Sequence, residues 1–274
     1  MTRKLASLWV DVPLGPIEQV SALSFLDAGH DLVVYSTGPL EGLPPGVELR
    51  DANEILSTDN IVKHRRTGSV ALYSDLFRYA LLNRTDHIWV DLDIVALRPL
   101  PADRDYLVGY ESDGEVNGAV LRLPKNSPAL AGLSQYNPQT RGYPPFLKGL
   151  RRFRYMLKSF GMGMHISDWP WGSIGPRGLT HFLTETGEIG QALQVEAFYP
   201  IPYQQAERFA RPHDLTFESF AEETFAVHLW GKALRQHIQE KHGGVVPRDS
   251  FLHKAIERYS AASGFAIGSG MASG

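Results

Sequence analysis

The spacing of apolar positions changes twice within the first sixty residues. Residues 5–10 form a short apolar run, and residues 32–35 form a second run rich in β-branched and aromatic side chains. Between the two runs, apolar residues recur at the spacing of one helix face, at Ile17, Val20, Leu23 and Leu26. Pro16 suits the start of this helix and Gly29 its end. A strand–helix–strand order with a short crossover predicts parallel strands and a right-handed connection.

The same two spacings recur farther along the chain. Helical spacing appears over residues 69–83, carried by Leu72, Leu76 and Ala80. An apolar strand over residues 87–90 follows directly. Further apolar runs, and a last helical pattern, lie at residues 106–110, 119–123, 225–230 and 248–260. Helices that alternate with strands in this way favour an α/β fold with a mostly parallel sheet.

The pattern contains no internal repeat and no clear linker. A length of 274 residues suits one large domain. We therefore expect a single α/β domain over residues 1–260. In residues 261–274, 11 of 14 residues are Gly, Ala or Ser, so this tail has little to bury and is expected to be loose.

Composition excludes several classes of protein. The apolar share of 43% is typical of a globular domain, and the net charge of −3 opposes a nucleic-acid partner that wraps the whole surface. Cysteine is absent, which rules out disulfides, cysteine-ligated metals and thiol catalysis. We see no signal peptide, and no run approaches the ~18 apolar residues of a membrane span. A cytoplasmic location is therefore the expectation.

Two acidic residues follow the strand expected over residues 87–90. In an extended chain, residues two apart point the same way, so Asp91 and Asp93 should project together at the carboxyl end of this strand. Ligands of open α/β sheets bind at that edge. Because paired carboxylates repel each other, a Mn²⁺ or Mg²⁺ ion would relieve the repulsion and still accept phosphate oxygens. The bland alternative is a solvated turn, since D-x-D is a short and common pattern.

The same acidic pair admits a second chemistry. Residues 91–95 match the phosphatase pattern D-x-D-x-[TV], in which Asp91 would be the nucleophile and Asp93 the general acid. That chemistry needs a later pair of acids for Mg²⁺, and we find no such motif downstream. A third possibility is a protein that binds nucleotide sugars or glycans without catalysis.

The helix before the strand carries another pair of charges. Asp75 and Arg78 are three residues apart and so share a helix face. They could form a surface ion pair worth less than about 1 kcal/mol. The alternative is a polar clamp, in which Asp75 accepts from sugar hydroxyls and Arg78 donates to hydroxyls or phosphate.

These residues carry a family resemblance. The run over residues 74–100 resembles the sugar-binding region with a DXD motif in glycosyltransferase family 32, a pattern shared by the large clostridial toxin glucosyltransferase domains. The matching positions are Asp75, Arg78, Trp89, Asp91 and Asp93. Residues 8–10, 25–30 and 47–55 resemble the family's first elements, residues 171–176 its Gly-Pro turn and residues 228–230 its His-x-Trp element. Together these segments span about residues 5–235.

The resemblance implies a single-domain GT-A fold and sugar transfer from a nucleotide donor, with UDP the expected nucleotide, Mn²⁺ (or Mg²⁺) as cofactor and retention of configuration. It implies that Trp9 stacks on the base and that Asp75 and Arg78 hold the sugar. It also implies that Asp91 and Asp93 bind the metal, with His228 or Trp230 closing over the metal or diphosphate. Asp11 stands where the family often has a small residue, and residues 232–235 stand where it often has a tryptophan.

Two further residues are candidates by position. Asn117 could face the donor sugar, as an asparagine does in related GT-A enzymes, or Asn117-Gly118 could simply form a turn. Asp168 could stabilise developing positive charge or touch acceptor hydroxyls. Its neighbours Trp169 and Trp171 could stack on an acceptor sugar or pack in the core.

Residues 146–160 combine helical apolar spacing with a cluster of cations. The apolar positions are Leu147, Leu150, Phe153, Leu157 and Phe160, and the cations are Lys148, Arg151, Arg152, Arg154 and Lys158. Such a helix can lie on an anionic membrane, or it can be a solvated helix over the core. The first reading predicts peripheral membrane contact where a lipid-linked acceptor would sit. The expected acceptor is a glycan, a lipid-linked glycan or another molecule.

Overall fold

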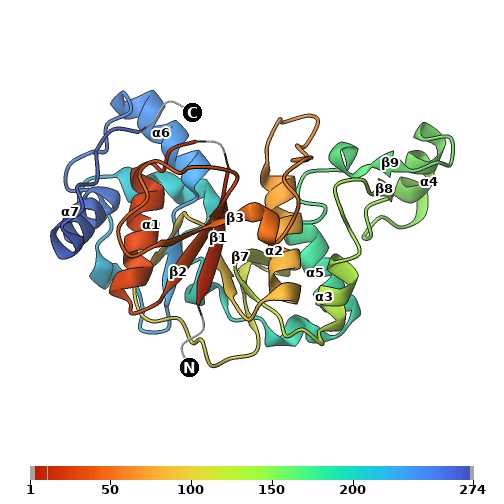
Figure 1. The fold of residues 1–274 in the computed structure, drawn as a ribbon, viewed down its shortest axis with the longest axis horizontal. Coiled ribbons are helices and arrows are strands. Elements are labelled where there is room, and N and C mark those ends of the chain that lie inside the picture. Colours follow the sequence, from red (N-terminus) through yellow and green to blue (C-terminus); the bar gives the residue numbers. More distant parts are fainter. Residues whose placement is uncertain (1–3, 11, 272–274) are drawn as a thin grey trace.

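A six-stranded sheet forms the centre of the computed structural model, which describes residues 4–10 and 12–271 (Figure 1). Asp11 lies outside the described residues. Across the sheet the strands are β3 (Glu48–Asp51), β2 (Leu32–Ser36), β1 (Leu5–Trp9), β4 (Ile88–Val90), β7 (Glu115–Arg122) and β6 (Leu107–Ser112). The first four are parallel, whereas β7 pairs antiparallel with both β4 and β6. The predicted mostly parallel α/β sheet is confirmed.

Helices cover both faces of this sheet, so its central strands are buried on both sides. The helices are α1 (Pro16–Asp27), α2 (Ala71–Arg84), α3 (Pro128–Leu133), α4 (Gly149–Lys158), α5 (Pro176–Glu185), α6 (Gly231–His242) and α7 (Phe251–Ser263). Leu5 and Ile88 join a core cluster with α1 and α7, whereas Ala6 and Trp89 join one with α2 and α5. This alternation explains why β1 and β4 read as continuous apolar runs. The arrangement matches a single GT-A-like domain.

Shorter elements complete the chain. Strand β5 (Ile94–Ala96) pairs antiparallel with β10 (Ala226–His228), and β8 (Arg141–Gly142) pairs antiparallel with β9 (Met164–His165). Short 3₁₀ helices occupy Ala52–Glu54, Ile166–Asp168, Glu188–Gln191, Val195–Ala197, Tyr203–Ala210 and Phe217–Ser219. Within the described ranges, no helix is both long and apolar enough to cross a bilayer.

The expected loose tail differs from the structure over the residues that are described. Residues 261–263 are the last turn of α7, and residues 264–271 run back over the domain. Ile267 and Met271 are buried in the core, and Met271 donates its N–H to the carbonyl of Gly244 at 2.7 Å. Two apolar residues spaced among small ones are sufficient to anchor this segment.

Candidate active site

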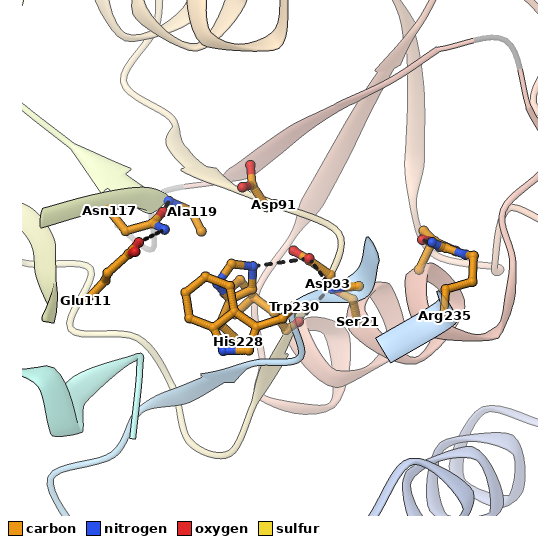
Figure 2. Close-up of polar contacts among 12 residues, drawn as sticks. Ser21, Asp91, Asp93, Glu111, Asn117, Ala119, His228, Trp230 and Arg235 are labelled. Carbon is orange, nitrogen blue, oxygen red and sulfur yellow. Dashed lines mark hydrogen bonds and ion pairs between the residues drawn. The ribbon is translucent and has the colours of Figure 1, made fainter. Parts of the chain in front are cut away.

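The two acidic residues lie where β4 ends. Asp91 extends the pairing with β7, donating its N–H to the carbonyl of Ala119 at 2.7 Å. Residues 91–93 then form a turn closed by the N–H of Ile94 and the carbonyl of Asp91 at 3.2 Å. Because the chain turns here, the expectation that both carboxylates project side by side is wrong. Figure 2 shows them pointing in different directions. Like charges separate, and each carboxylate has its own cationic partner.

Asp91 completes a buried cluster with the helix upstream. Its Oδ1 accepts from Nη2 of Arg78 at 3.1 Å and from the indole N–H of Trp89 at 2.7 Å. Nη2 of Arg78 also lies 3.6 Å from Oδ1 of Asp75. The Cζ atom of the same guanidinium lies 5.0 Å from the ring centre of Trp89. The side chains of Arg78 and Asp75 are only 7% and 14% exposed. They are therefore not a solvated surface pair, and the sugar contacts of this clamp stay a prediction.

Burial shapes the charges of this clamp. Burial raises the pKa of Asp75 to about 6, with the Arg78 charge opposing the shift and the Asp91 charge adding to it. Burial also raises the pKa of Asp91 against the pull of Arg78. One guanidinium thus serves the largely buried Asp75 and the partly exposed Asp91, an arrangement typical of functional sites.

Asp93 is held by the C-terminal part of the chain. Its Oδ2 accepts from Nε2 of His228 at 3.1 Å and from the N–H of Gly231, the first residue of α6, at 2.8 Å (Figure 2). Burial alone would raise the pKa of Asp93, but the His228 charge and these hydrogen bonds hold it below its usual value. Burial likewise opposes the charge of His228, yet Asp93 and Asp91 raise the pKa of that imidazole. Each of the two groups therefore favours the charged form of the other.

Trp230 supports His228 from behind. The two rings lie 4.0 Å apart between centres, and the indole N–H donates to the carbonyl of Ile201 at 2.8 Å. Trp230 adopts a φ of 55°, an uncommon backbone conformation for a bulky residue and one often retained at functional sites. Its side chain is buried, so it positions His228, and contact with a donor stays a prediction.

A cleft of about 350 Å³ opens beside these groups. Its walls include Trp9, Arg78, Asp91 and Asp93, as the resemblance implies, together with side chains from α1 and α6. Trp9 is fixed by its indole N–H, which donates to the carbonyl of Val12 at 2.8 Å. An aromatic wall thus stands in the same cleft as the acidic pair.

Three charged residues of this cleft were not predicted from the sequence: Glu18, Lys232 and Arg235. Buried Glu18 pairs with Arg235, and burial raises the pKa of Glu18. Lys232 and Arg235 lie near the start of α6, where the helix dipole disfavours cations. Two cations in this position were the signal in the sequence that pointed to a ligand. The N–H groups at the start of a helix favour an anion, and nearby cations strengthen that preference.

Three glycines leave room for the clamp. An added Cβ would lie 2.6 Å from Nη1 of Arg78 at Gly118, 2.8 Å from Oδ2 of Asp75 at Gly175, and 3.1 Å from Asp93 at Gly231. Real Cβ contacts at the first two distances are essentially absent. These glycines therefore let the acidic and basic side chains approach the backbone.

Asn117 lies in the middle of β7, so the turn interpretation is wrong. Its side-chain oxygen accepts from the N–H of Ala119 at 2.8 Å, and its amide donates to Glu111 (Figure 2). Ala119 is also the residue whose carbonyl accepts from Asp91. Asn117 is thus linked to Asp91 through the backbone of Ala119. Its contact with a sugar stays a prediction.

Asp168 is not brought to the acidic turn. It pairs with Arg65 at 3.0 Å and lines a separate hollow of about 630 Å³. Trp169 is buried, as the core interpretation predicts, whereas Trp171 is 47% exposed and lines the hollow. Trp171 also lines a small cavity beside Asp75, so the two regions adjoin.

The predicted metal ligands are near one another without forming a ready cluster. Across the described ranges, no group of three or more His, Asp or Glu side chains is arranged to hold a metal ion. His228 and Asp93 are in contact, while Asp91 faces Arg78. Within the same ranges, the hydrogen bonds and ion pairs use Oδ1 of Asp91 and Oδ2 of Asp93, so each carboxylate has a further oxygen for a ligand. Two carboxylates and an imidazole fit Mn²⁺ or Mg²⁺ by donor type.

Comparison with known proteins tests the resemblance. The family described as "Alpha 1,4-glycosyltransferase conserved region" matches residues 156–249. Lactosylceramide 4-alpha-galactosyltransferase of Rattus norvegicus is 29% identical over 173 residues, covering 58% of this chain and 40% of that protein. The Homo sapiens protein of that name is 27% identical over 173 residues, covering 58% and 41%. These matches support the resemblance to glycosyltransferase family 32.

The extent of these matches defines what they support. The family match includes Trp171, His228, Trp230 and the start of α6, and it does not reach Asp91 or Asp93. The aligned region spans about two fifths of the length of the Rattus norvegicus and Homo sapiens relatives. The comparisons thus show similarity to glycosyltransferases over part of this chain.

Proposed function

We propose that this chain is a metal-dependent glycosyltransferase that moves a sugar from a UDP-sugar to a glycan or lipid-linked acceptor with retention of configuration. The observation that carries the proposal is the buried Asp75–Arg78–Asp91 clamp beside the Asp93–His228 pair, at the carboxyl end of a central strand. The similarity to galactosyltransferases supports sugar transfer, and the resemblance supports the nucleotide donor and retention.

The donor nucleotide would occupy the cleft of about 350 Å³. Trp9 would stack on the base at one wall. In the same cleft, Lys232, the first N–H groups of α6 and Arg235 offer positive charge for the diphosphate. Arg235 is already partnered by Glu18, so Lys232 is the cation with more freedom to follow the phosphate.

The sugar would lie over the clamp. A carboxylate with a raised pKa, Asp75, accepts hydrogen bonds from sugar hydroxyls while Arg78 fixes its position. Orientation of the ring by such fixed groups lowers the entropic part of the barrier. Asn117 is proposed as a further contact to the sugar. Its side chain is held near Asp91, because the backbone of Ala119 is hydrogen-bonded to both residues.

Asp91, Asp93 and His228 are the proposed metal ligands. A Mn²⁺ or Mg²⁺ ion bound there would neutralise negative charge that develops on the leaving diphosphate. Trp230 holds the imidazole at its place by ring packing. Gly231 fixes Asp93 to the start of α6, which links the acidic turn to the phosphate-facing helix.

The acceptor would enter through the hollow that contains Asp168. This hollow and the small cavity beside Asp75 share Trp171, so an acceptor sugar stacked on Trp171 would approach the donor sugar. Asp168 is proposed to contact acceptor hydroxyls.

A donor panel tests this function. UDP- and GDP-sugars are added to the purified chain with Mn²⁺, with Mg²⁺ or with a chelator, and thermal stability and donor hydrolysis are measured. We expect one UDP-sugar to give metal-dependent stabilisation and slow hydrolysis. Stabilisation without hydrolysis or transfer would favour a non-catalytic binding protein. The proposal would be overturned if no donor changed the thermal stability or was hydrolysed, in a sample that unfolds cooperatively.

A further inference from the structure

Helix α4 is unlike the other described α-helices because none of its residues is buried. Leu150, Phe153 and Leu157 are 78%, 53% and 61% exposed, and Phe160 just beyond the helix is 89% exposed. At 100° per residue, the three side chains on the helix fall within one third of its circumference. A solvated helix that covers the core would bury this face, so the core interpretation of residues 146–160 is wrong.

Cations border the apolar face of α4. They are Lys148, Arg151, Arg152, Arg154 and Lys158. The sequence contains no Asp or Glu between Glu115 and Asp168. In the part of the chain that the structure describes, Lys148 alone of the five has an ion-pair partner, Glu185 at 3.2 Å. The charge on this surface is therefore largely uncompensated.

A hollow of about 520 Å³ lies against α4. Arg151, Arg154, Lys158 and Arg177 supply its charge, and Leu157 is among its apolar walls. Cations around an apolar floor suit the phosphate and upper acyl chain of a lipid. The hollow shares Tyr155 and Arg177 with the one that contains Asp168.

We propose that α4 and the loop to Met162 dock on the surface of an anionic phospholipid bilayer. The apolar side chains enter the headgroup boundary, and Arg151, Arg154 and Lys158 lie at the level of the phosphates. Figure 1 shows α4, β8 and β9 at the end of the molecule opposite α7. A second copy is disfavoured as the occupant, because it would bring two cationic surfaces together.

Docking goes beyond the proposed function. It would bring the hollow that contains Asp168 close to the bilayer. The hollows along Arg177 and Trp171 connect α4 to the region beside Asp75. An acceptor held in the membrane would therefore approach along the protein surface rather than from bulk solvent.

Vesicle co-sedimentation at low salt tests the docking. The chain is mixed with vesicles of phosphatidylcholine alone or of phosphatidylcholine with phosphatidylglycerol. We expect binding to the anionic vesicles only, and a loss of that binding as salt is raised. The double variant Arg151→Gln/Arg154→Gln should bind roughly 25-fold more weakly, at about fivefold for each cation. Phe153→Ser/Leu157→Ser should also lose binding, through the apolar face.

A matched control lies at the other end of the molecule. Lys241→Gln/Arg248→Gln removes two exposed cations, and Val245→Ser removes an exposed apolar side chain between them. These controls should bind as the parent chain does. Because the α4 residues are exposed, thermal unfolding of every variant should be unchanged, and donor binding measured on the same samples separates docking from the proposed function.

Three results would overturn the proposal. The first is no binding of the parent chain to anionic vesicles at low salt. The second is equal loss in the α4 and control variants, which would show a non-specific charge effect. The third is a dimer that Phe153→Ser/Leu157→Ser converts to a monomer without any vesicle binding, which would assign the face to a second copy of the chain.

Discussion

The acidic turn after β4 and helix α4 handle charge in opposite ways. At the turn, Asp91 is held by the buried guanidinium of Arg78 and Asp93 by the buried imidazole of His228. On α4, the four cations have no carboxylate partner in the described residues, and the apolar side chains beside them face solvent. The first region keeps charge inside a shaped cleft, whereas the second presents charge and apolar area together.

This difference separates two kinds of recognition. Buried and paired charges cost free energy to desolvate, and they hold fixed positions from which a small ligand can be oriented. Exposed charges around an apolar face cost little and fix no geometry, but they suit a broad and soft surface. The following predictions test whether the two regions differ as described.

The largest effect should come from the acidic turn. Asp93→Asn keeps the size of the side chain but removes the charge that His228 and the metal would share, so donor hydrolysis and transfer should fall at least ~100-fold. Asp113→Asn, in the exposed turn between β6 and β7, is the control and should leave hydrolysis and transfer unchanged. Activity of Asp93→Asn equal to the parent chain would refute the metal assignment.

The second effect should be a gain of stability at Asp75. Burial raises the pKa of Asp75 from 3.8 to about 6, so the folded state binds a proton more tightly than the unfolded state. Stability from this group is full below pH 3.8 and is lost as the pH rises through 6. Asp75→Asn should therefore stabilise the ligand-free chain by up to about 3 kcal/mol at pH 8, at 1.36 kcal/mol for each pKa unit.

Urea unfolding in chelator at pH 8 and pH 4 measures this gain, which should shrink at pH 4. The same variant should lose transfer activity, because Asp75 is proposed to hold the sugar. An Asp75→Asn protein that is less stable at pH 8 would mean that the carboxylate is needed for the fold.

A smaller effect is expected at the start of α6. Lys232→Gln should weaken uridine diphosphate binding about tenfold and leave uridine binding unchanged, since a charge-assisted hydrogen bond to phosphate is lost. Lys241→Gln, at the other end of the same helix, is the control. Calorimetric titration separates the two ligands, and equal loss for both would place Lys232 away from the phosphates.

The smallest effect should be on α4. Phe153→Ala should change the free energy of unfolding by no more than about 0.5 kcal/mol, because the ring is exposed. Phe77→Ala on α2 should cost about 3–5 kcal/mol, because that ring is fully buried. A large loss for Phe153→Ala would mean that α4 packs on the domain in solution.

Local patterns determined much of this fold. The spacing of apolar residues predicted β1, α1, β2, α2 and β4 to within a few residues. The helical spacing of Asp75 and Arg78 placed both side chains on one face, which the structure confirms. These features depend on neighbours three or four positions away, so the sequence carries them directly.

Other features needed the tertiary structure. Asp93 and Gly231 are 138 residues apart, and the pairing of β5 with β10 brings His228 and α6 to the acidic turn. Ile267 and Met271 likewise anchor a segment whose composition alone predicted a loose tail.

The sequence by itself determined the elements, the acidic pair at the end of a strand and the amphipathic character of residues 149–158. Only the tertiary structure decided that the acids separate toward different cations and that the apolar face of α4 is uncovered. The physical reason is that periodicity is a property of neighbours along the chain. The partner of a buried charge, and the burial of a helix face, depend on which distant segment packs against it.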